Sequence, residues 1–109
     1  MRTKKTKKPI TEASIYALVD PNTNQIKYIG QTKQRLNERL KSHLMCYSCN
    51  GKMTKKDEWI NSLLELGIRP EIRLLKKVKI RFVNTEERKS IIEYKNMGVE
   101  LFNINHFTR

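Results

Sequence analysis

The chain has 109 residues, 38% of them hydrophobic, and a formal net charge of +12 at pH 7. This length allows one domain with one modest core. No run approaches the ~20 apolar residues of a membrane span, and no apolar stretch follows the basic N-terminus as in a secretory signal. The charge predicts a polyanionic partner, and nucleic acid is the first candidate. The protein is expected to be cytoplasmic.

The first residues are the most basic part of the chain. Five Lys and Arg lie between Arg2 and Lys8 with no acid among them, so residues 1–9 are expected to form a flexible arm before a single domain at 10–109. Without these five charges the domain keeps a net +7 (12 minus 5). Both parts are therefore expected to contact nucleic acid, the arm through Lys4, Lys5, Lys7 and Lys8.

Two runs rich in strand-forming residues follow the arm. The first begins at Ile15, the second covers 26–29, and the turn residues at 20–24 between them predict an antiparallel hairpin with a loop of roughly five or six residues. Alternation along the second run places Tyr28 on the face of Ile26, with Lys27 on the opposite face. Gly30 then ends the strand, as in a tight turn or beside a closely approaching ligand.

A basic amphipathic helix is predicted next, from after Thr32 or Gln34 to about Met45. Its apolar stripe also contains His43, with Arg39 one turn earlier on the edge of the stripe. The stripe residues are Leu36, Leu40, Leu44 and Tyr47. The basic residues expected to contact nucleic acid here are Lys33, Arg35 and Lys41.

Cys46 and Cys49 are the two cysteines of the chain. A C-x-x-C pair lacks the four ligands of a structural zinc site, although His43 would supply a third. A zinc-stabilised interaction domain is therefore one alternative. The simpler interpretation is that the two cysteines are reduced thiols near a helix end.

The next elements are a helix and a third strand. Thr54 is expected to cap the helix, with Asp57 in its first turn and Gly67 at its end. The strand is expected from Glu71 to about Phe82, closing a three-stranded sheet. Its apolar residues with a period of two are Ile72, Leu74, Val78 and Ile80.

The last helix is predicted to open at Asn84 or Thr85 and to end before Gly98. Glu87 is on its inward-leaning side, whereas Glu86 lies on a wetter side. If Asn84 is the N-cap, Glu87 occupies the third helical position, where a capping-box glutamate is expected for structural reasons alone.

Five elements now stand in order: S-I-Y at 14–16, Y-I-G at 28–30, R-L-x-x-H at 39–43, T-E-E-R with Glu87, and L-F-N ending at 103. In this order and spacing the chain resembles the GIY-YIG nuclease family. Two departures are a serine at position 14, usually glycine, and the absence of the Gly-Gly that often follows the closing asparagine. The resemblance implies an α/β fold of the α+β type, with a three-stranded antiparallel sheet flanked by three helices in the order ββααβα.

The resemblance also implies a metal-dependent endonuclease that hydrolyses DNA phosphodiester bonds. The catalytic residues it implies are Tyr16, Tyr28, Arg39, His43, Glu87 and Asn103, with Glu87 as the metal ligand. One carboxylate holds one Mg²⁺ or Mn²⁺ if phosphate oxygens and waters complete the octahedral shell. In this hypothesis the arginine grips the phosphate, the tyrosines assist the attacking water, and His43 accepts a proton or orients that water.

Each of these residues also has an ordinary structural interpretation, such as half-buried strand tyrosines and a core histidine. The main alternative is therefore a basic nucleic-acid-binding module that keeps the nuclease fold without catalysis. Specificity for a DNA is expected from a separate targeting domain, a partner protein or a preference for DNA shape. A homing, restriction, phage, mobile-element or repair role is compatible with the same residues.

Overall fold

The computed structural model describes residues 11–45 and 54–103 of the chain. The helices and strands are β1 Glu12–Asp20, β2 Gln25–Thr32, α1 Leu36–Met45, α2 Lys55–Glu65, β3 Glu71–Lys79 and α3 Val83–Asn96, with a 3₁₀ turn at Ile80–Phe82. This order is ββααβα, so the expected fold is confirmed. The lysines of the basic arm, Tyr47 and both cysteines lie outside the described residues.

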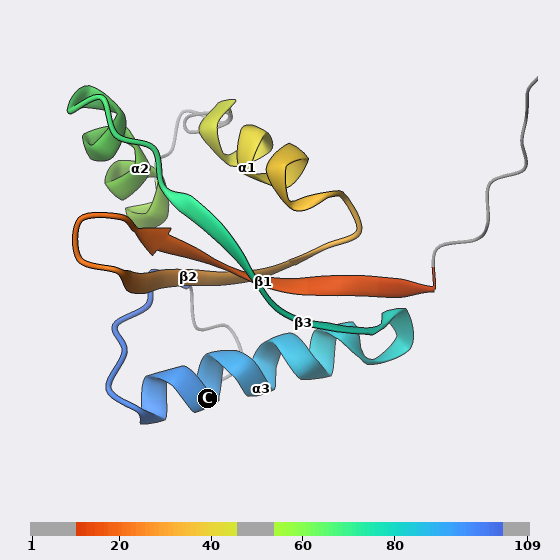
Figure 1. Cartoon of the computed structure of the whole chain (residues 1–109). Helices are drawn as coiled ribbons and strands as arrows, with labels where there is room; N and C mark the ends of the chain where they lie inside the picture. Colours follow the sequence, from red (N-terminus) through yellow and green to blue (C-terminus); the bar gives the residue numbers. More distant parts are fainter. Residues whose placement is uncertain (1–10, 46–53, 104–109) are drawn as a thin grey trace, which may run out of the picture.

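β1 is the central strand of a three-stranded antiparallel sheet with the order β2-β1-β3. Helices α1 and α2 cover one face of the sheet and α3 covers the other (Figure 1). Because both faces are covered, residues 13–19 of β1 are all buried. The strand therefore reads as an almost continuous apolar run rather than an alternating one.

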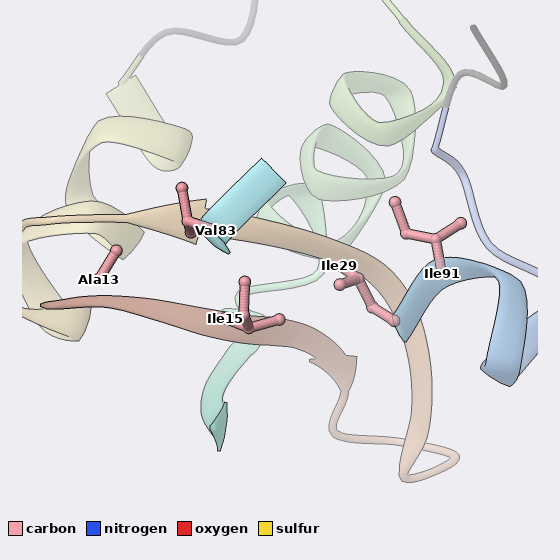
Figure 2. Close-up of a cluster of buried hydrophobic side chains, with 5 residues drawn as sticks. All are labelled: Ala13, Ile15, Ile29, Val83 and Ile91. Atoms are coloured by element: carbon pink, nitrogen blue, oxygen red, sulfur yellow. The ribbon is translucent and has the colours of Figure 1, made fainter. Parts of the chain in front are cut away.

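The sheet separates two apolar clusters. The cluster on the α3 face contains Ala13, Ile15, Ile29, Val83 and Ile91 (Figure 2). On the other face, the buried residues are Tyr16, Leu18 and Ile60, packed against Leu36, Leu40 and Leu44 of α1. The three described residues of the predicted stripe thus face the sheet, and they hold α1 beside β1.

A β-bulge in β2 overturns the expected alternation around Tyr28. Leu18 pairs with Tyr28 and Val19 pairs with Ile26, so Lys27 is the extra residue. Ile26 packs against the α3-face cluster, whereas Tyr28 packs against the cluster that contains Tyr16. The prediction that Ile26 and Tyr28 share a face was wrong, because a bulge shifts the alternation by one residue.

A second bulge, in β3, also shifts the alternation of side chains between the two faces of the sheet. Ile15 pairs with Lys76 and Tyr16 pairs with Leu74, which leaves Leu75 as the extra residue. Leu75 packs on the α3 face and Leu74 is 47% exposed, so the predicted shared face of this strand was also wrong. The strand ends at Lys79, because the next residues form the 3₁₀ turn that leads into α3.

The helix ends follow their local sequence signals. Thr54 caps α2 as predicted, and with Asp57 it forms a capping box. Gly67 and Gly98 adopt positive φ angles after α2 and α3. Helix α3 begins at Val83 without a side-chain cap. The capping box considered for Glu87 is therefore absent, and its carboxylate does not cap the N-terminus of α3.

Candidate active site

Tyr16 is the centre of a hydrogen-bonded group on the α1 face of the sheet. Its hydroxyl oxygen lies 2.6 Å from Nε2 of His43 and accepts a hydrogen bond from Nε of Arg39 at 3.1 Å. Tyr16 has no exposed surface and His43 is 4% exposed, whereas Arg39 is half-buried. The i, i+4 spacing predicted for Arg39 and His43 thus brings both side chains to one phenol.

Gly30 makes room for this group. It pairs with Tyr16 across the sheet, and a Cβ at Gly30 would lie 2.6 Å from the Tyr16 hydroxyl oxygen. Such a contact is far inside van der Waals distance, so any larger residue displaces the phenol. The glycine is required by the close approach of a side chain of the same domain.

Tyr28 packs against the same two side chains. Its ring centroid lies 6.5 Å from that of Tyr16 and 5.6 Å from that of His43. Lys56, at the start of α2, adds a cation 5.2 Å above the Tyr28 ring and 3.2 Å from Nδ1 of His43. An ammonium group thus closes the side of the cluster that faces α2.

Burial dominates the ionisation of these groups. It lowers the pKa of His43 to about 3, with the charges of Lys56 and Arg39 acting in the same direction. It raises the pKa of Tyr28 to about 12. It also raises the pKa of Tyr16, despite the opposing hydrogen bond and charge of Arg39. At neutral pH the site therefore holds two phenols and a neutral imidazole.

Glu87 reaches the site from α3, on the other face of the sheet (Figure 1). Its Oε1 accepts a hydrogen bond of 3.1 Å from the side-chain amide of Gln31 in β2, and its charge raises the pKa of both Tyr16 and Tyr28. Glu86 instead pairs with Lys76 at 2.8 Å and with Lys89 at 3.6 Å. Of these two adjacent carboxylates, Glu87 is the one that interacts with the tyrosines.

Asn103 binds the backbone of β2. Its Oδ1 accepts from the N–H of Ile29 at 2.9 Å, and its Nδ2 donates to the carbonyl of Ile29 at 2.7 Å. The neighbouring Phe102 N–H donates to the carbonyl of Lys27 at 2.7 Å. Asn103 therefore fixes the segment of β2 that carries Tyr28 and Gly30.

The comparison with protein families agrees with this geometry. The family model described as the GIY-YIG catalytic domain matches residues 12–95, most of the chain. The chain belongs to the GIY-YIG family. No curated protein and no solved structure gives a significant match.

Membership of the GIY-YIG family implies nuclease activity on DNA, and nucleases of this family generally depend on a divalent metal. The matched range contains Tyr16, Tyr28, Arg39, His43 and Glu87. Within residues 11–45 and 54–103, no helix combines the length and hydropathy needed to cross a bilayer.

The GIY-YIG domain divides its predicted nucleic-acid-binding residues between two surfaces. Lys33 and Arg35 line one groove together with Lys77 of β3, beside Ser14 and Thr32. Lys41 lines a separate groove at the junction of α1 and β3 with Arg69. The lysines of the arm lie outside the described residues.

The sequence did not predict Lys56 and Gln31 of the candidate active site, nor Lys77 of the groove. Lys77 lies in a strand whose alternation is shifted by a bulge, and Lys56 lies in the first turn of a different helix. Only Gln31 carried a local signal, because it directly follows Y-I-G.

The described residues fit a single-carboxylate metal site better than a ligand cluster. Among residues 11–45 and 54–103, no group of three or more His, Cys, Asp and Glu side chains is placed to hold a metal. Mg²⁺ is commonly held by one or two carboxylates with waters and phosphate oxygens, so Glu87 alone fits that ion. Each ring nitrogen of His43 has a hydrogen-bonding neighbour, Tyr16 or Lys56, and the two cysteines of the zinc alternative lie outside the described residues.

Proposed function

We propose that this domain is an endonuclease that hydrolyses DNA phosphodiester bonds with one Mg²⁺ or Mn²⁺ ion held by Glu87. The observation that carries the proposal is the convergence of Arg39 and His43 on the Tyr16 hydroxyl within electrostatic reach of the Glu87 carboxylate. Hydrolysis needs a phosphate-binding group, a group that orients the attacking water and a carboxylate for the metal, and we assign these to Arg39, Tyr28 and Glu87.

Arg39 is proposed to bind the scissile phosphate. Its Nε donates to Tyr16, and its terminal nitrogens have no hydrogen-bond partner within the described part of the chain. A guanidinium oriented in this way can present two N–H groups to two phosphate oxygens. The bond to Tyr16 therefore prepares the arginine for the phosphate before DNA arrives.

The two tyrosines are proposed to have different roles. Tyr28 is half-buried and remains a phenol at neutral pH, so it suits a donor to a phosphate oxygen or to the attacking water. Tyr16 has no exposed surface, so it acts on the reaction through Arg39 and becomes a base only if the bound state uncovers it and lowers its pKa. A divalent ion, when bound, supplies positive charge that favours deprotonation of water and neutralises the phosphate.

Asn103 is proposed as a positioning residue, because both of its amide groups bind the backbone of Ile29. DNA contacts by Lys33, Arg35, Lys41 and the arm lysines Lys4, Lys5, Lys7 and Lys8 remain predictions, as do the cytoplasmic location and a separate targeting domain or partner. These assignments extend the cleavage proposal to binding and specificity.

The test is cleavage of supercoiled plasmid by the full chain with Mg²⁺ or Mn²⁺. Nicking or linearisation is expected, and EDTA should stop it. Glu87→Gln should abolish cleavage while the far-UV circular dichroism spectrum is unchanged. The matched control is Glu86→Gln, which changes the adjacent carboxylate and should still cut.

Two results would contradict the proposal. Equal cutting by Glu87→Gln and wild type would refute the metal assignment. DNA binding without cutting, on supercoiled, linear and branched DNA, would favour the non-catalytic nucleic-acid-binding module.

A further inference from the structure

His43 has a hydrogen-bonding neighbour at each ring nitrogen. Nε2 lies 2.6 Å from the Tyr16 hydroxyl oxygen, and Nδ1 lies 3.2 Å from Nζ of Lys56. The low pKa of His43 keeps the ring neutral at neutral pH. A neutral imidazole carries one proton, so one nitrogen donates and the other accepts. A partner that can only donate a hydrogen bond therefore determines which ring nitrogen lacks the proton.

Lys56 is that partner when it is charged. An ammonium group has three N–H donors and no acceptor, so the bond to Nδ1 requires a lone pair on Nδ1. Burial lowers the pKa of Lys56, but the Asp57 carboxylate, 3.6 Å from Nζ, opposes that shift. The ring of Tyr28 below Nζ also favours a cation. The Asp57 carboxylate and the Tyr28 ring both favour the ammonium form of Lys56, and with that form the ring proton is placed on Nε2.

A proton on Nε2 changes the role of His43 toward Tyr16. Nε2–H donates to the phenol oxygen, and Nε of Arg39 donates to the same oxygen at 3.1 Å. The oxygen thus accepts two hydrogen bonds, and its own proton points away from both donors. If Tyr16 loses that proton, the phenolate already has two donors in place.

We propose that Lys56 is a positioning residue that fixes the tautomer of His43, so that His43 donates to the Tyr16 oxygen instead of accepting its proton. Its effect on DNA cleavage rests on the proposed function, whereas its effect on the tautomer does not. The capping box of Thr54 and Asp57 holds the first turn of α2, and with it Lys56, beside the ring.

The experiment reads the tautomer directly. ¹⁵N chemical shifts of the imidazole distinguish protonated from unprotonated ring nitrogens, and His106→Gln leaves His43 as the single histidine of the chain. In that background Lys56→Met removes the donor and Lys56→Arg keeps one. Lys55→Met is the matched control, because Lys55 is exposed and adjacent.

In the parent protein the proton is expected on Nε2. Lys56→Met should move it wholly or partly to Nδ1, and plasmid cleavage should fall by about tenfold or more, as when a histidine loses its orienting partner. Lys56→Arg and Lys55→Met should keep both the tautomer and the cleavage rate. Circular dichroism of each variant establishes that it is folded.

A proton on Nδ1 in the parent protein, or an unchanged tautomer in folded Lys56→Met, would overturn the proposal. If Lys56→Met does not fold, a moved proton in Lys56→Arg overturns it, and a retained one supports it. If the parent protein cuts no DNA, the proposed function fails while the nitrogen shifts still decide the tautomer.

Discussion

Arg39 connects the buried Tyr16 hydroxyl to the surface of the domain, where we propose that the DNA phosphate binds. Its Nε binds a phenol with no exposed surface, while the side chain as a whole is half-buried. A lysine at this position keeps the charge but has no fork and no fixed plane. The proposed role of Arg39 therefore needs the planar geometry of a guanidinium as well as a positive charge.

Arg39→Lys should reduce plasmid cleavage by about a hundredfold, the scale of losing one oriented donor to a reacting centre. Its melting temperature should change little, because the residue is half-buried. Arg81→Lys, which is exposed in the 3₁₀ turn before α3, is the control and should retain activity. Equal rates for both variants would mean that charge alone is needed at residue 39.

His43 should make the folding stability depend on pH. Its pKa is 6.5 when unperturbed and about 3 in the fold, so below about pH 6.5 the unfolded chain binds a proton that the native chain does not. Stability should therefore fall as the pH drops from about 6.5 toward 3, by up to ~1.4 kcal/mol per pH unit.

Urea denaturation of the wild type and of His43→Gln at several pH values measures this contribution. The carboxylates titrate in both proteins, so the difference between their curves isolates the imidazole. A constant difference between pH 7 and pH 4 would show that His43 does not titrate on unfolding in that range.

At the scale of the elements, prediction from sequence succeeded where one local signal decides the structure. The capping box at Thr54 and the glycine after α3 are such signals, and the stripe of α1 shows its periodicity directly. It failed at the two bulges, at Lys27 and Leu75, because a bulge depends on pairing with β1 and not on the strand itself.

The sequence predicted the residues of the candidate site that belong to a motif, but it did not predict Lys56. The motif order identified the tyrosines, Arg39 and His43, which meet as expected. Lys56 comes from a separate helix, and nothing in its neighbouring sequence indicates that Nζ will reach an imidazole on another element. Such a contact is determined by tertiary packing.

Asn103 gives β2 a partner along its outer edge. Asn103→Ala leaves the backbone N–H and carbonyl of buried Ile29 without these bonds, and it should cost about 1–3 kcal/mol of unfolding free energy. A domain of this size should then melt at least ~4 °C lower. Asn37→Ala, exposed on α1, should not lower the melting temperature.

Gly30→Ala tests the close approach of β2 to Tyr16. The added Cβ meets the hydroxyl oxygen and Cζ of the ring, so overpacking of about 1–3 kcal/mol and a loss of cleavage are expected. Removing the hydroxyl in the double variant with Tyr16→Phe should relieve part of that strain. Strictly additive losses of stability would show that residue 30 and the phenol do not interact.

At the scale of the whole molecule, no single layer contains the site. The phenols and His43 lie on the face covered by α1 and α2, while Glu87 comes from the helix on the opposite face (Figure 1). The positive charge is also spread, since the domain keeps a net +7 (12 minus 5) without the arm. DNA affinity should therefore have a contribution from the arm and another from the folded surface.

Deletion of residues 1–8 removes five positive charges and no negative one. If these residues bind phosphates, the slope of log binding constant against log salt should become less negative by up to ~0.9 for each phosphate that is no longer neutralised. Fluorescence anisotropy with a short duplex measures both slopes. An unchanged slope would mean that the arm does not bind the DNA backbone.

The groove beside Ser14 and Thr32 is the part of the folded surface expected to bind DNA without the arm. Replacing Lys33 and Lys77 together by glutamine should weaken binding and reduce the salt slope by roughly 2, because two fewer phosphates are neutralised. Lys89→Gln removes a charge from α3, on the opposite face of the sheet, and should leave the slope unchanged. If Lys89→Gln weakens binding as much per charge as the groove variant, the domain attracts DNA by its net charge and not through this groove.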